Sequence, residues 1–238
     1  MQNVDIGIIG LGYVGQAVES FLKKFYKIHT YDINGKSNCN SLKEIVDLSE
    51  VLFICLPTPS MKDGSCDLRI VEDVISNINI LSKKSSKLIV IKSTIPVGTT
   101  DKFIAKYKKI KFCFNPEFLT EANFIEDFEN QERIIIGGDN IDLIYNIYLE
   151  TFKDVKIITT DCKTAEMVKY VTNTFLATKV SFANEISSFC SKLNIDYERI
   201  IDIAKLDHRL GNSHWKVPGP DGKKGYGGSF FPKDIASL

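Results

Sequence analysis

Short runs of apolar and β-branched residues alternate with segments of helical periodicity along the first two thirds of the chain. Strands of a parallel sheet that is covered on both faces read as continuous apolar runs, because both sides of each strand are buried. The alternation therefore predicts βαβ units in a doubly wound α/β domain with a mostly parallel sheet. The predicted strands are Val4–Ile9, Lys27–Tyr31, Val51–Leu56, Lys87–Ile91, Lys111–Phe114 and Arg133–Gly137.

A different pattern begins near Asp161, where the chain reads as one helix from Lys163 to about Leu193. This helix is longer than most helices of globular proteins, and apolar residues cover most of its circumference. Such a helix must be covered from more than one side. A core helix of one monomer and a helix shared with a second subunit explain the pattern equally well. We predict a boundary here, with one domain in residues 1–160 and a mainly helical domain, built on this helix, in residues 161–238.

Charge and hydropathy exclude several classes of partner. The 238 residues carry 30 Lys and Arg against 30 Asp and Glu, with no basic block that would bind nucleic acid or an anionic membrane. The longest apolar run, Val51–Leu56, is far short of the roughly 20 residues of a membrane-spanning helix. The first residues lead straight into a strand without the pattern of a signal peptide, so we predict a cytoplasmic protein.

The cysteines and histidines show no metal-binding spacing. The six cysteines are scattered without a Cys-x-x-Cys pair, which favours reduced structural thiols. The three histidines, His29, His208 and His214, stand apart from other metal-binding side chains. We therefore expect no metal site.

A glycine-rich turn follows the first predicted strand. It reads Gly10-Leu11-Gly12-Tyr13-Val14-Gly15 and opens a helix, and Asp32 ends the second strand. Glycines at this spacing permit a tight turn and close approach of a pyrophosphate to the helix N-terminus, while the carboxylate binds ribose hydroxyls. In this strand–turn–helix–strand context the motif predicts a Rossmann-type dinucleotide site. Asp32 would repel a 2′-phosphate, which favours NAD over NADP.

Three further turns follow later strands, at Leu56–Pro59, Lys92–Gly98 and Asn115–Phe118. Each alone is typical of a turn that simply ends a strand. The carboxyl ends of parallel strands meet at one edge of the sheet, where open α/β sheets bind ligands. Together the three turns are expected to line one cleft.

Lys169 and Asn173 lie one helical turn apart on the long helix, within a largely apolar surround. Burial of an unpaired lysine is costly, so Lys169 needs a carboxylate or an anionic transition state as partner. A structural Lys–Glu pair and an oxyanion site fit the pattern equally well. Glu117 and Glu121 are four residues apart, a spacing typical of the solvated face of a helix.

The segment Gly211–Gly228 is rich in Gly, Pro, Lys and Asp. Such a composition predicts a loop with several unusual backbone conformations. Long loops of this kind are more often functional than structural. The chain then reads as the start of another helix and ends at Leu238.

The motifs GLGYVG, CLPTP, KSTIPVGTT, NPEFLTEANF, AEMVKYVTNTFLATKVSFANEI, DHRLG and GYGGSFFPKD resemble, in this order, those of the UDP-glucose/GDP-mannose dehydrogenases. The resemblance spans essentially the whole chain. It implies an NAD-binding Rossmann domain in residues 1–160 and a central helical and dimerisation domain in residues 161–238. Members of the family oxidise a sugar CH2OH to a carboxylate in two NAD-dependent steps, through a bound aldehyde and a cysteine thioester. The implied substrate is a nucleotide sugar, UDP-glucose, and the implied product is UDP-glucuronate.

The resemblance also assigns roles by position. Glu117 and Thr94 would hold water or act in acid–base steps, while Lys169 and Asn173 would stabilise an oxyanion. Asp234 would orient or activate the nucleophile and water. The residues implied in NAD binding are Gly10, Gly12, Tyr13, Val14, Gly15, Asp32, Thr58, Ser93, Thr94 and Glu121.

A further set of residues is implied in substrate binding. Arg209 resembles an arginine that reaches the substrate phosphate of a neighbouring subunit, which implies a homodimer through the helix from Lys163 to Leu193. Tyr226 and Gly227 match a loop that wraps the nucleotide sugar. The full substrate set is Glu117, Phe118, Leu119, Lys169, Asn173, Arg209, Tyr226 and Gly227.

The chain departs from the family at Phe230, which occupies the position of the nucleophilic cysteine. A phenylalanine cannot form a thiohemiacetal, so we expect no thioester and little or no acid product. The family's C-terminal nucleotide-binding domain is also not matched, and we expect it to be supplied by another chain or lost by truncation. Two alternatives remain: an NAD-binding assembly subunit that needs a partner chain, and a two-electron dehydrogenase of the hydroxyacid type.

Overall fold

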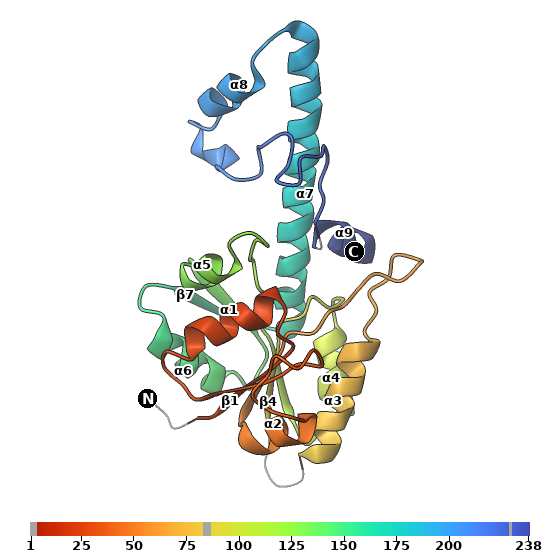
Figure 1. The fold of residues 1–238 in the computed structure, drawn as a ribbon, viewed down its shortest axis with the longest axis vertical. Coiled ribbons are helices and arrows are strands. Elements are labelled where there is room, and N and C mark those ends of the chain that lie inside the picture. Colours follow the sequence, from red (N-terminus) through yellow and green to blue (C-terminus); the bar gives the residue numbers. More distant parts are fainter. Residues whose placement is uncertain (1–3, 83–86, 229) are drawn as a thin grey trace. The chain divides into compact units, whose positions relative to one another are not determined.

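The computed structural model describes residues 4–82, 87–228 and 230–238. The chain divides into two compact units, Met1–Lys169 and Tyr170–Leu238. In Figure 1 the ribbon is coloured along the sequence, from red at the N-terminus to blue at the C-terminus. The domain boundary predicted between residues 160 and 161 lies nine residues before this division, and it remains a prediction. Within the described ranges, no helix combines the length and the apolar character that crossing a bilayer requires.

The first unit is built on a seven-stranded sheet with the strand order β2-β1-β3-β4-β5-β6-β7. Every neighbouring pair is parallel except β5 and β6, which meet in an antiparallel bridge between Phe114 and Gly137. The strands are β1 (Ile6–Ile9), β2 (Ile28–Tyr31), β3 (Val51–Ile54), β4 (Leu88–Ile91), β5 (Lys111–Phe114), β6 (Arg133–Gly137) and β7 (Lys156–Thr160). The predicted mostly parallel, doubly wound sheet is therefore confirmed, with β7 added at one edge.

Six helices cover this sheet before the long helix begins. In Figure 1, α1 and α6 lie on one face of the sheet and α2, α3 and α4 on the other. Alternate strand residues point to opposite faces, so Phe53 packs in the core with α1 and α6 while Leu52 packs in the core with α2 and α3. The helices are α1 (Tyr13–Leu22), α2 (Leu42–Leu48), α3 (Arg69–Leu81), α4 (Thr99–Lys106), α5 (Phe124–Glu129) and α6 (Asp142–Thr151).

The chain reverses its direction of travel across the sheet at β1. This strand pairs in parallel with β2 on one side and with β3 on the other. The helices that follow β1 and β3 pack on opposite faces of the sheet, and open α/β sheets bind ligands where the strand order reverses in this way. The predicted glycine loop and the turn at Leu56–Pro59 lie at these two strand ends.

The long helix α7 (Cys162–Leu193) begins in the first unit and continues into the second. Asp161 precedes it and accepts hydrogen bonds from the Thr164 amide at 2.9 Å and the Thr164 hydroxyl at 2.6 Å, which caps the N-terminus of the helix. The predicted start at Lys163 is thus one residue late, and the predicted end is correct.

The second unit folds back on α7 around a small core of Ala183, Ile201 and Trp215. The Tyr197 hydroxyl donates a hydrogen bond to the Trp215 carbonyl at 2.6 Å and fixes the loop that follows. The remaining helices are α8 (Tyr197–Ala204), a 3₁₀ turn η1 (His208–Leu210) and α9 (Phe231–Ser237). Positive φ angles at Gly211, His214, Gly222, Gly225 and Gly228 confirm the unusual backbone predicted for this loop.

Candidate active site

The glycine loop after β1 is shaped by close backbone approach. A Cβ on Gly15 would lie 1.9 Å from the Gly10 carbonyl oxygen, and a Cβ on Gly10, at φ +94°, would lie 2.5 Å from the Cys55 carbonyl oxygen. By contrast, a Cβ on Gly12 would meet no atom within 4 Å. Gly10 and Gly15 are therefore required by the fold, whereas Gly12 leaves open space at the N-terminus of α1. Open space beside unpaired helix amides fits an approaching pyrophosphate.

Asp32 braces this loop from the end of β2. Its carboxylate accepts hydrogen bonds from the Leu11 amide at 2.7 Å and the Asn34 amide at 2.8 Å. Each carboxylate oxygen has further lone pairs, so ribose hydroxyls can bind in addition. The described residues therefore fit the adenosine half of a dinucleotide.

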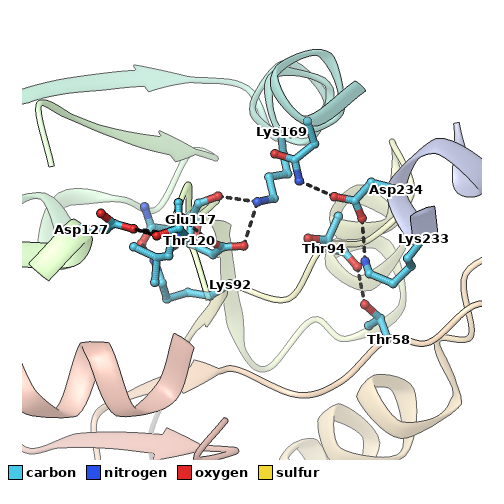
Figure 2. Close-up of polar contacts among 12 residues, drawn as sticks. Thr58, Lys92, Thr94, Glu117, Thr120, Asp127, Lys169, Lys233 and Asp234 are labelled. Carbon is cyan, nitrogen blue, oxygen red and sulfur yellow. Dashed lines mark hydrogen bonds and ion pairs between the residues drawn. The ribbon is translucent and has the colours of Figure 1, made fainter. Parts of the chain in front are cut away.

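Hydrogen bonds join the turn after β3 to the turn after β4. The Ser93 hydroxyl donates to the Leu56 carbonyl at 2.7 Å and accepts from the Leu56 amide at 2.9 Å. The Thr58 hydroxyl donates to the Thr94 carbonyl at 2.8 Å (Figure 2). Thr58, Ser93 and Thr94 are all buried. The structure thus brings three predicted cofactor residues together, with the hydroxyls of Thr58 and Ser93 engaged in holding the turns.

Lys169 and Glu117 form a buried ion pair at the carboxyl end of β5. The Lys169 Nζ lies 2.8 Å from Glu117 Oε1 and 2.6 Å from the Glu117 carbonyl oxygen, and both side chains are 3% exposed (Figure 2). The other oxygen of Glu117 accepts from the Leu119 amide at 2.8 Å. Burial raises the pKa of Glu117, but the Lys169 ammonium, the Leu119 amide and the charge of Lys92 together outweigh burial and hold this pKa below its ordinary value.

This geometry corrects one sequence interpretation. Glu117 and Glu121 do not share a solvated helical face, because residues 115–120 form neither helix nor strand and Glu117 is buried. Glu121, in the following turn, is half-buried. Residues Phe118 and Leu119 are also half-buried, and the Phe118 ring lies 5.5 Å from the Lys169 Nζ. The sequence analysis considered a carboxylate or an anionic transition state as the partner of Lys169, and the structure provides the carboxylate of Glu117.

A second buried lysine was missed by the sequence analysis. Lys92 donates to the Asn115 side-chain oxygen at 2.8 Å, and the Tyr148 hydroxyl donates to the same oxygen at 2.6 Å. Burial lowers the pKa of Lys92 to about 8. Its position in the sequence could have identified Lys92, because it directly follows an apolar strand. A charged side chain at that position is either buried with a polar partner or exposed at the end of the strand.

Glu166, also missed, is fully buried on α7 and contacts the start of α4. Its carboxylate accepts from the Gly98 amide at 2.5 Å and from the Thr100 amide at 2.9 Å. Glu166 precedes Lys169 by three residues, so the first turns of α7 carry two buried charged groups. The spacing of three residues puts Glu166 and Lys169 on one face of the helix, and this was the sequence signal that could have pointed to Glu166.

In the second unit, Asp234 on α9 is fully buried and accepts from Asn173 Nδ2 at 2.5 Å. Lys233, which the sequence analysis did not single out, contacts the other carboxylate oxygen at 2.7 Å (Figure 2). The Asp234 amide donates to the Phe230 carbonyl at 3.0 Å, which places Phe230 one turn before Asp234 at the start of α9. The structure therefore brings Asn173, Asp234 and Phe230 together.

The predicted residues of the glycine-rich loop remain on the surface of the second unit. Tyr226 and Gly227 are exposed, and the Arg209 guanidinium, also exposed, forms a bidentate contact with Asp207. Asn184 of α7 accepts from the Gly225 amide at 3.0 Å and so anchors the loop beside Tyr226.

Comparison with known proteins places these features in one family. Residues 18–156 match the model of the NAD binding domain of the UDP-glucose/GDP-mannose dehydrogenase family, and residues 163–238 match its central domain. The chain belongs to the UDP-glucose/GDP-mannose dehydrogenase family. The fold seen in the first unit is therefore the family's NAD-binding domain, and the glycine loop lies just before the matched range.

Relatives within the UDP-glucose/GDP-mannose dehydrogenase family are longer than this chain. A UDP-glucose 6-dehydrogenase of Rickettsia bellii is 40% identical over 198 residues, which cover 80% of this chain and 44% of the relative. A UDP-glucose dehydrogenase from Pyrobaculum islandicum has a similar structure, with a TM-score of 0.85 and 32% identity over 98% of this chain and 62% of that chain. A GDP-mannose dehydrogenase from Pseudomonas aeruginosa gives a TM-score of 0.79 with 28% identity over 97% of this chain and 62% of that chain. The chain spans about half the length of the curated relatives it matches.

Proposed function

We propose that this chain is the NAD-binding and central part of a nucleotide-sugar dehydrogenase, which oxidises the sugar CH2OH of UDP-glucose towards UDP-glucuronate. The observation that carries the proposal is the buried Lys169–Glu117 pair, which lies at the carboxyl edge of the same sheet as the glycine loop. An ammonium beside an ionised carboxylate at a ligand-binding edge suits the removal of a proton from an alcohol.

The cofactor would bind at the loop after β1. Gly12 leaves room for the pyrophosphate, the α1 amides would bind its oxygens, and Asp32 would bind the adenosine ribose. When bound, NAD supplies the acceptor for the hydride that leaves the sugar C6. The wider proposed contact set is Gly10, Tyr13, Val14, Gly15, Thr58, Ser93, Thr94 and Glu121.

The proton chemistry would fall to the buried pair and its neighbours. As the C6–H bond of the alcohol breaks, two electrons leave with the hydride and the hydroxyl proton passes to Glu117 directly or through a water held with Thr94. Lys169 and Asn173 would stabilise the negative charge that develops on the C6 oxygen. The lowered pKa of Glu117 keeps the carboxylate ionised at neutral pH, which a proton acceptor requires.

The second oxidation would fail at Phe230. In the family a cysteine thiolate adds to the aldehyde, and the resulting thiohemiacetal loses a second hydride to become a thioester. Phe230 has no nucleophilic atom, so this chain would stop at the aldehyde and Asp234 would have no thiol to orient.

Each unit carries residues that the family resemblance implies in substrate recognition. In the first unit, Phe118 and Leu119 would flank the sugar beside Glu117. In the second unit, Tyr226 and Gly227 would wrap the nucleotide sugar. Arg209, held by Asp207 in this structure, would reach the phosphate bound to a neighbouring subunit.

We further propose a cytoplasmic homodimer that forms through α7. Large apolar side chains are exposed along this helix, and Phe182 is 54% exposed. Phe175, Phe182 and Phe189 recur every seven residues, a period that places all three on one stripe of the helix. Such a stripe in water favours burial against a second copy.

A second candidate function is an NAD-binding assembly subunit without turnover, which Phe230 favours. The experiment that separates the two supplies the chain with NAD and UDP-glucose, monitors NADH and traps aldehyde with an amine reagent. A dehydrogenase forms one NADH and one trapped aldehyde for each sugar consumed, and Lys169→Met abolishes this, while Lys163→Met, at an exposed lysine of the same helix, does not. NAD binding without NADH formation favours the assembly subunit, and the absence of NAD binding contradicts both.

A further inference from the structure

Glu166 is a buried acidic residue in the first turns of α7. Its side chain is fully buried, and among residues 4–82, 87–228 and 230–238 no lysine, arginine or histidine forms an ion pair with it. Burial accordingly raises the pKa of Glu166. Three hydrogen bonds satisfy the buried carboxyl group, from the Gly98 amide at 2.5 Å, the Thr100 amide at 2.9 Å and the Thr100 hydroxyl at 2.7 Å.

These donors belong to the first residues of α4. Gly98 occupies the N-cap position at φ +87° and has no side chain to bind the free amides of the first turn. A serine or aspartate at the cap would satisfy these amides locally. Here the acceptor comes instead from α7, 66 and 68 residues later in the sequence, so the contact fastens one helix to another.

Both partners of this contact adjoin residues of the proposed active site, Gly98 through the segment that precedes it and Glu166 through the helix that follows it. The chain between Lys92 and Gly98 contains Thr94, whose carbonyl holds the Thr58 hydroxyl. On α7, Lys169 follows Glu166 by three residues and binds Glu117 in the turn after β5. Residues 166–169 therefore link the turn after β4 to the turn after β5 through less than one turn of helix.

We propose that Glu166 is a positioning residue, which fixes the first turns of α7 against the turn after β4 and so holds Lys169 on Glu117. The inference rests on the proposed function, because Lys169 and Glu117 are the pair that would act on the alcohol. Glu166 itself touches neither of them and acts through the helix. Its removal disturbs the ion pair without removing either partner.

The test measures hydrogen exchange of the Lys169 ammonium by NMR in protein labelled with 15N at lysine. The resonance is assigned by its loss in Lys169→Met. In Glu166→Gln the side-chain amide can accept from Thr100 but presents its NH2 group to the Gly98 amide. We expect ammonium exchange at least tenfold faster in this variant. The matched control is Asp101→Asn, which breaks an exposed ion pair between Asp101 and Lys163 on the same two helices and leaves the exchange rate within twofold.

A folded Glu166→Gln protein with a Lys169 exchange rate within twofold of the wild type overturns the proposal. Should this variant not fold, Thr100→Val removes one of the three donors and is expected to raise the exchange rate at least threefold, and no change overturns the proposal. Oxidation assays give a second readout, in which Glu166→Gln lowers kcat at least tenfold with KM for NAD within threefold. Wild-type protein that binds no NAD overturns the proposed function, while the ammonium result still decides the role of Glu166.

Discussion

Replacement of Lys92 by methionine tests how this buried lysine contributes to stability. The side chain is buried, and its ammonium donates to the neutral side-chain and main-chain oxygens of Asn115 and lies 5.6 Å from the Phe128 ring centre. Burial lowers its pKa from the ordinary 10.5 to about 8. The folded state therefore disfavours the charged form, and the resulting destabilisation is present at pH 7 and is relieved as the pH rises from about 8 to about 10.5.

The size of the effect follows from the proton linkage. Each pH unit over which only the unfolded chain binds the proton adds about 1.4 kcal/mol to the free energy of unfolding, which gives about 2–3 kcal/mol between pH 7 and pH 10. Cysteine and tyrosine groups titrate in the same range, so the measured quantity is the difference between the wild type and Lys92→Met. We expect the wild type to gain about 2–3 kcal/mol relative to the variant over this interval.

The assay is urea unfolding at fixed temperature at pH 7, 8, 9 and 10, with Lys102→Met as the control at an exposed lysine. The control is expected to differ from the wild type by a constant amount at all four pH values. A difference between the wild type and Lys92→Met that stays within about 0.5 kcal/mol across the range would refute the reasoning. It would mean that Lys92 is hydrated or paired in solution.

Three further predictions address the cofactor loop, the ion pair and the dimer. Gly12→Ala should fold normally, because the added Cβ meets no atom within 4 Å, and it should weaken NAD binding at least tenfold in calorimetry. Gly15→Ala, whose Cβ would overlap the Gly10 carbonyl oxygen, should fail to fold or lose several kcal/mol of stability in urea unfolding. Lys169→Met should lower the free energy of unfolding by about 3–5 kcal/mol, because it leaves Glu117 as an unpaired buried charge. The double variant Lys169→Met with Glu117→Leu should recover at least half of this loss. Equal stability of the single and double variants would contradict a buried pair. Phe182→Ser should convert a dimer to a monomer in sedimentation with no loss of NAD binding, and a wild type that already sediments as a monomer would contradict the proposed interface.

Most of the sheet could be predicted from the sequence because its strands are buried on both faces. Val51–Ile54 and Leu88–Ile91 consist entirely of apolar residues and are completely covered, so their pattern has one interpretation. The edge strand β7 escaped prediction for the opposite reason. Its residues Lys156–Thr160 are half-buried or exposed, and the segment holds only two large apolar side chains.

The site was predicted in its parts but not in its pairing. Sequence placed Lys169 on an apolar helix and Glu117 in a turn, but the two lie 52 residues apart and only the fold shows that they meet. The interpretation of Glu117 as part of a solvated helix failed because a spacing of four residues indicates a shared face only if the segment is helical. The structure shows no helix over residues 115–120, and the proline at position 116 disfavours helical backbone at Asn115 before it.

Buried polar residues that hold other parts of the chain in place were the hardest to predict from the sequence. Glu166 and Lys92 bind main-chain atoms and neutral side chains, and such contacts leave no residue of opposite charge to find in the sequence. Lys233 was overlooked because it is adjacent to Asp234, and neighbouring charges in a helix usually point apart. Their roles follow from geometry alone.

The most direct test of the central claim is calorimetric titration of the purified chain with NAD, and then with UDP-glucose at saturating NAD, while absorbance reports NADH. The account predicts that NAD binds, that UDP-glucose binds to the NAD complex, and that no more than one NADH forms for each sugar. Formation of two NADH for each sugar would contradict the role assigned to Phe230, and a chain that binds no NAD would contradict the function proposed for the whole site.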